Sequence, residues 1–119
     1  MIYYRQKIDN FTEKFEKCSI IILLGENHSI LQKEAKKISD ALAGKNADAE
    51  MRVKKYFNYE INEKKNEIIT SLKTKSFFPG RQIILLIELN EKDYKFITEI
   101  DAEWQNGDAI TIVTTNALS

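Results

Sequence analysis

The run Ile20-Ile21-Ile22-Leu23-Leu24-Gly25 decides the fold of this chain. Its large aliphatic residues do not alternate with polar ones, so both faces of the strand that they form must be covered. A strand buried on both faces is typical of the centre of a parallel sheet. The run from Ile83 to Ile87 has the same character and predicts a second buried strand over residues 82–88.

Helices are expected between the strands because apolar residues recur there with a period of about 3.6. Leu31, Ala35, Ile38 and Leu42 predict the clearest helix, which ends at Gly44. The other expected elements are a short helix over residues 10–18, a half-exposed edge strand over 51–59, a helix from Ile61 to near Lys75, a helix capped by Asn90, and a last strand over 109–113 after the turn Asn106-Gly107.

Strands that alternate with helices at this spacing are joined by right-handed crossovers and build a parallel sheet flanked by helices. Four strands and about four helices fit the 119 residues of the chain. The predicted fold class is therefore α/β, in a single domain over residues 1–119.

The composition argues against several classes of protein. The chain has 18 basic and 18 acidic residues, so it lacks the basic field of an autonomous nucleic-acid binder. Its apolar runs are far shorter than the roughly 20 residues that span a bilayer, and the N-terminus has no signal-peptide pattern. Cys18 is the only cysteine, so we expect it in the core rather than in a disulfide or a zinc site. We expect a cytoplasmic protein without a cofactor.

Gly25 closes a strand and leads into a helix, which is where nucleotide-binding folds hold phosphate. A P-loop, G-x-x-x-x-G-K-[ST], needs a second Gly, a Lys and a Ser or Thr at the positions of Ile30, Leu31 and Gln32. The dinucleotide pattern G-x-G-x-x-G also fails here, and Glu26 would repel a phosphate. A small nucleotide-binding protein or NTPase is kept as the alternative function.

Other residues invite a chemical role. Glu88 ends the second buried strand, where an ATPase holds magnesium, but without a phosphate-binding lysine we expect a solvated carboxylate. His28 has no assignable serine, cysteine or aspartate partner and is predicted to lie on the surface. A solvated face is expected for Lys33, Lys36, Lys37 and Lys45. Tyr56, Phe57 and Tyr59 are expected to pack in the strand core and at its edge.

The adjacent aromatics Phe77 and Phe78 stand between a helical stretch and the breaker run Pro79-Gly80-Arg81. Neighbouring residues in a turn point in different directions, so a small domain buries one ring more easily than both. An apolar ring exposed on a loop is typical of a docking site. The other interpretation places both rings in the core of an unrelated α/β domain.

Together these features resemble the N-terminal domain of the delta subunit family of the bacterial DNA polymerase III clamp loader. The strand, loop and helix from Ile22 to Leu31 resemble that family's degenerate P-loop. The stretch Ser76-Phe77-Phe78-Pro79-Gly80-Arg81 resembles its pattern of a small residue, an apolar residue, Phe, a two-residue turn and Arg. The order of helices and strands agrees over essentially the whole chain.

The resemblance implies the AAA+-like first domain of a longer subunit, whose helical lid and collar domains lie outside this sequence. It implies a subunit without intrinsic enzymatic activity that binds and opens the sliding clamp (the beta subunit). Further implied partners are the delta prime and gamma or tau subunits, with DNA contacted only through the assembly. Phe77 and Phe78 match the pair that enters the clamp pocket, Ser76 matches the small residue before it, and Lys73 occupies a position where the family commonly has Gln.

Overall fold

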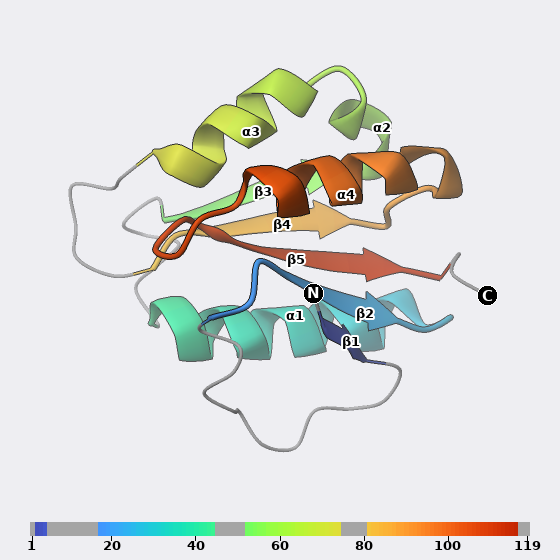
Figure 1. Cartoon of the computed structure of the whole chain (residues 1–119). Coiled ribbons are helices and arrows are strands. Elements are labelled where there is room, and N and C mark those ends of the chain that lie inside the picture. The colour runs from blue at the N-terminus through green and yellow to red at the C-terminus, as the bar shows by residue number, and fades with distance from the viewer. Residues whose placement is uncertain (1, 5–16, 45–51, 75–80, 117–119) are drawn as a thin grey trace.

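The fold is a parallel β-sheet between two layers of helices (Figure 1). The computed structural model describes residues 2–4, 17–44, 52–74 and 81–116. The elements in chain order are β1 (Ile2–Tyr4), β2 (Ile20–Leu24), α1 (His28–Ala43), β3 (Val53–Phe57), α2 (Asn58–Ile61), α3 (Lys65–Lys73), β4 (Ile83–Ile87), the short 3₁₀ helix η2 (Glu91–Asp93), α4 (Tyr94–Glu103) and β5 (Ile110–Thr115).

All strand pairs described are parallel, and the strand order is β1-β2-β5-β4-β3. The predicted α/β class with a parallel sheet is confirmed, and so are the two buried strands and the edge position of β3. The expectation of four strands was wrong, because Ile2–Tyr4 adds a fifth beside β2. A three-residue strand is too short to show a period of its own, and only its pairing with β2 defines it.

The two faces of the sheet carry separate apolar cores, because successive strand side chains point to opposite faces. Ile20, Ile22 and Leu24 pack with α2, α3 and α4, whereas Ile21 and Leu23 pack with α1. Figure 1 shows α1 on one face and the other three helices on the opposite face. Right-handed crossovers explain this division. The connection through α1 leads from β2 to the far edge strand β3, whereas those through α3 and α4 lead back in the opposite direction, to β4 and then to β5.

The predicted helix after Gly25 is confirmed as α1. Its first turn is capped by Asn27, whose side-chain oxygen accepts a hydrogen bond from the Ile30 amide at 3.1 Å. Its end is Gly44, which has a φ of 91° and donates its amide to the Asp40 carbonyl. Cys18 is buried, as predicted, and its thiol lies 2.9 Å from the Ile20 carbonyl oxygen. The helix predicted over residues 10–18 falls almost entirely outside the described residues.

Several predicted boundaries were wrong. The last strand runs over Ile110–Thr115 rather than over residues 109–113. The edge strand ends at Phe57, and Tyr59 belongs to α2. One helix was expected from Ile61 to near Lys75, but the structure has two, α2 and α3, separated by residues 62–64. The apolar spacing continues across the break because both helices pack on the same core. Asn90 makes no side-chain cap, and η2 leads into α4 instead.

Candidate functional site

The predicted docking residues Ser76, Phe77 and Phe78 fall in residues 75–80, outside the described part of the chain, so their role remains a prediction. The structure describes both flanks of this segment. On one side α3 ends at Lys73, and on the other side Arg81 precedes β4. Both flanks lie at the edge of the sheet where β4 and β5 begin, which we call the amino edge (Figure 1).

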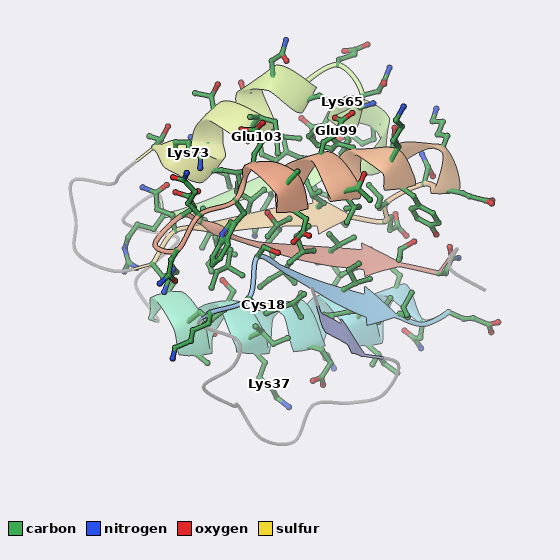
Figure 2. The ribbon with its side chains drawn as sticks, viewed as in Figure 1. Cys18, Lys37, Lys65, Lys73, Glu99 and Glu103 are labelled. Atoms are coloured by element: carbon green, nitrogen blue, oxygen red, sulfur yellow. The ribbon has the colours of Figure 1, made fainter. Side chains whose placement is uncertain are left out.

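Lys73 is fastened to the turn that joins α4 to β5. Its ammonium group lies 2.7 Å from the Glu103 carbonyl oxygen and 2.5 Å from Oδ2 of Asp108. Figure 2 shows Lys73 and Glu103 side by side at the ends of α3 and α4. The same Asp108 oxygen accepts the Gln105 amide at 2.8 Å, and only 12% of the Asp108 side chain is exposed. This carboxylate therefore joins one flank of the predicted docking segment to the loop before β5.

The second flank reaches the same turn. The Arg81 guanidinium donates to the Asp108 backbone carbonyl at 3.2 Å, and the Gln82 carbonyl accepts the Ile110 amide at 3.1 Å. The buried Arg52 donates to the Arg81 carbonyl and to the Ala43 carbonyl at the end of α1. Residues 73 and 81 are thus both attached to the turn at Asp108, a residue that the sequence did not single out.

The opposite end of the strands, which we call the carboxyl edge, holds the loop after Gly25. A pocket of about 250 Å³ opens there. His28 and Glu88 both line it, and Nδ1 of His28 lies 3.1 Å from a Glu88 carboxylate oxygen. Both side chains are exposed, at 44% and 52%, as the sequence predicted. The structure adds the partner that sequence reasoning did not find for His28, because Glu88 directly follows β4, 60 positions later in the chain.

Glu88 has a φ of 57°, an uncommon conformation for a residue other than glycine. Its amide donates to the Thr114 hydroxyl at 2.9 Å, and the next amide, of Leu89, donates to the Thr114 carbonyl at 2.9 Å. These two bonds hold the end of β4 against β5. They direct the chain so that the Glu88 carboxylate faces the loop after β2.

The comparison with protein families agrees with this architecture. The family model described as DNA polymerase III, delta subunit, matches residues 21–111. The chain belongs to this family. The match runs from β2 into β5 and so includes both flanks of the predicted docking segment. Membership implies a clamp-loader role in DNA replication within a non-catalytic part of the polymerase III complex. Neither the curated proteins nor the solved structures gave a match.

In this delta-family chain the carboxyl edge is poorly suited to a nucleotide phosphate. Glu26 and Glu88 line the pocket with carboxylates, which repel an anion. The Ile30 amide at the start of α1 is already bonded to the Asn27 side chain, so one of the donors that would bind a phosphate is occupied. The geometry therefore gives no support to the nucleotide-binding alternative.

None of the helices in the described part of the chain is both long and apolar enough to span a membrane.

Proposed function

We propose that this chain is an AAA+-like, clamp-binding domain that docks on the sliding clamp through Phe77 and Phe78. The observation that carries the proposal is the family match over residues 21–111, which includes this aromatic pair. Ser76 and Lys73 complete the proposed binding segment. In the proposed setting the domain works in the cytoplasm, beside delta prime and gamma or tau subunits that perform the ATP-dependent steps.

The attachment of both flanks to Asp108 supports a docking role. Lys73 binds its carboxylate and Arg81 binds its backbone carbonyl, so the chain enters and leaves residues 75–80 from one base. Fixing the ends of a binding segment before it meets its partner lowers the entropy lost on binding. Each phenyl ring that enters an apolar pocket then contributes about 1.5 to 3 kcal/mol.

The AAA+-like assignment rests on the arrangement of β2, Gly25 and α1. A central parallel strand that leads through a short loop into a helix is the arrangement from which P-loops are built. Here Leu31 occupies the position of the phosphate-binding lysine, so we propose a degenerate P-loop. The domain would then act on the clamp by binding alone. If it binds an opened clamp more tightly than a closed ring, the difference in affinity shifts the clamp toward opening.

The test compares binding of the native chain and of the double variant Phe77→Ala/Phe78→Ala to the immobilised cognate clamp. Loss of two aromatic anchors at about 2 kcal/mol each predicts a dissociation constant larger by about 10³-fold. Tyr59→Ala is the matched control, because Tyr59 is an aromatic residue with 77% exposure in α2, at the carboxyl edge. This control should bind like the native chain.

Unfolding by urea separates docking from packing in the same variants. If the two rings dock on the clamp and do not pack in the core, the urea midpoint of the double variant stays close to that of the native chain. A loss of several kcal/mol would place the rings in the core and contradict the proposal. Unchanged affinity in a well-folded double variant would also refute it.

A further inference from the structure

A groove lies between α1 and the edge strand β3, on the opposite face of the sheet from α3 and α4. Helix α1 packs over β5, β2 and β4 and leaves β3 beside it. The β3 side chains divide between the two faces: Lys54 reaches Ser71 of α3 at 3.3 Å, so Val53, Lys55 and Phe57 belong to the α1 face. Among the described elements, no other helix covers this half of the face.

The groove has an aliphatic floor and a volume of about 230 Å³. Leu85 and Ile87, which are 8% and 5% exposed, form the floor above the fully buried Ile112, and Ala35 and Val53 contribute the lower walls. An apolar cavity of about 150 Å³ in another protein is large enough to hold benzene. The groove therefore has room for one large apolar side chain from a partner.

Lysines stand on both walls above this floor. Lys33 and Lys36 come from α1, and Lys55 comes from β3. Lys36 lies 3.7 Å from Asp40, which is the one acidic residue among those that line the groove in the described structure. The expected solvated lysine face is thus partly confirmed by local ion pairs, but the charge around the groove is positive overall. Such a rim attracts acidic groups.

An exposed aromatic pair extends the apolar surface toward the carboxyl edge. Phe57 pairs with Ile87 in the sheet, two positions beyond the pair of Lys55 with Leu85. The rings of Phe57 and Tyr59 stack with centroids 5.9 Å apart and planes within 4°. Phe57 is 39% exposed and Tyr59 is 77% exposed. The expected packing in the strand core holds for Tyr56, and Phe57 lies in the edge strand as expected, whereas Tyr59 lies in α2. Exposed aromatic residues are common in protein interfaces.

We propose that this groove is a docking site for an acidic segment of a partner protein, which inserts one apolar side chain between Lys33 and Lys55. The recessed floor is aliphatic, which favours a protein side chain, whereas a nucleic-acid base stacks on an aromatic face. The exposed rings of Phe57 and Tyr59 lie beside the floor and already stack on each other. Lysines on both walls favour carboxylates on both sides of the inserted residue. The groove shares no lining residue with the flanks of the Phe77 segment, so it would serve a second contact.

The test is an NMR titration of the isotopically labelled chain with the peptide acetyl-Glu-Asp-Glu-Trp-Glu-Asp-Glu-amide at low salt. Saturable shifts of backbone amides are expected in α1 and β3, around Lys33 and Lys55. A peptide with alanine in place of tryptophan should bind about tenfold more weakly or worse, because the floor contact is lost. A short oligothymidylate, titrated in parallel, tests the competing nucleic-acid interpretation.

Charge reversal supplies the matched control. Lys33→Glu/Lys55→Glu should weaken peptide binding by about tenfold or more. Lys92→Glu/Lys95→Glu changes the net charge equally at exposed positions outside the groove and should have a much smaller effect. Phe77→Ala/Phe78→Ala should bind the peptide like the native chain, which keeps this test independent of clamp docking. Urea midpoints confirm that each variant is folded.

Three results would overturn the proposal. The first is the absence of saturable shifts at about 1 mM peptide, a concentration sufficient for weak docking. The second is a set of shifts that maps away from α1 and β3, or equal losses in both charge-reversal variants. The third is binding of the oligothymidylate, and not the peptide, at the groove amides, which would assign the surface to nucleic acid.

Discussion

The ion pair of Lys73 with Asp108 should contribute measurably to stability, and a double-mutant cycle can isolate its contribution. The variants are Lys73→Met, which keeps the aliphatic stem, and Asp108→Asn, which keeps an oxygen for the Gln105 amide. Comparing the stability of the double variant with the sum of the two single changes cancels effects that belong to one side chain alone. The remaining coupling energy reports the contact between the two charges.

Its magnitude follows from distance and burial. The atoms Nζ and Oδ2 are 2.5 Å apart, and the Asp108 side chain is 12% exposed while that of Lys73 is 41% exposed. Fully exposed pairs contribute about 0.2 to 1 kcal/mol, and charge-assisted hydrogen bonds are stronger than neutral ones. Because water still reaches Lys73, we expect a coupling of about 1 kcal/mol, near the upper end of the exposed range.

The assay is urea unfolding of the native chain, the two single variants and the double variant. The dependence of the unfolding free energy on urea concentration, the m value, should be the same in all four. Lys36 and Asp40 supply the control cycle, since they lie 3.7 Å apart at 70% and 41% exposure. Their coupling should be at most about 0.5 kcal/mol. A Lys73–Asp108 coupling no larger than this control, or close to zero, would refute the assignment of Asp108 as an anchor.

The same variants distinguish two roles for Lys73 in clamp binding. If Lys73 holds the base of the docking segment, Lys73→Met weakens clamp binding in the native chain but has little further effect in the Asp108→Asn background. If Lys73 touches the clamp directly, the loss is the same in both backgrounds. In either case the effect should be smaller than that of removing both rings, because the aromatic anchors remain.

Two further predictions concern titration and nucleotide. Burial raises the pKa of the Tyr56 hydroxyl above its ordinary value of 10.0. The neutral Tyr56 side chain therefore contributes fully to stability below pH 10, and this contribution falls as the pH rises from 10 toward the folded pKa. The urea midpoint should fall less steeply between about pH 9 and pH 11 in Tyr56→Phe than in the native chain. Calorimetry with ATP and magnesium should show no saturable heat, since Leu31 replaces the P-loop lysine. Saturable binding that is lost on changing the Gly25 loop would restore the nucleotide-binding alternative.

Much of the architecture was predictable because burial on both faces leaves a mark that local sequence carries. The runs Ile20–Leu24 and Ile83–Ile87 lack polar alternation, and both are fully buried central strands. The period of α1 and its end at Gly44 are equally local features. Phe77 and Phe78 were conspicuous for the opposite reason, since two rings beside a breaker run are difficult to bury together.

The features that only the tertiary structure decided depend on residues far apart in the chain. The strand β1 is defined by its pairing with β2, and β5 lies between β2 and β4 although it comes last in the sequence. Sequence reasoning selected Lys73 but not Asp108, 35 positions later, and it left His28 without its partner Glu88, which follows β4.

By itself, the sequence determined the α/β class, the buried strands and the aromatic pair, because each depends on the spacing of neighbouring side chains. The tertiary structure alone decided which turn holds the flanks of that pair and which half of the α1 face no described helix covers. Both depend on the strand order, and parallel strands reach their positions through crossovers whose partners no local pattern specifies.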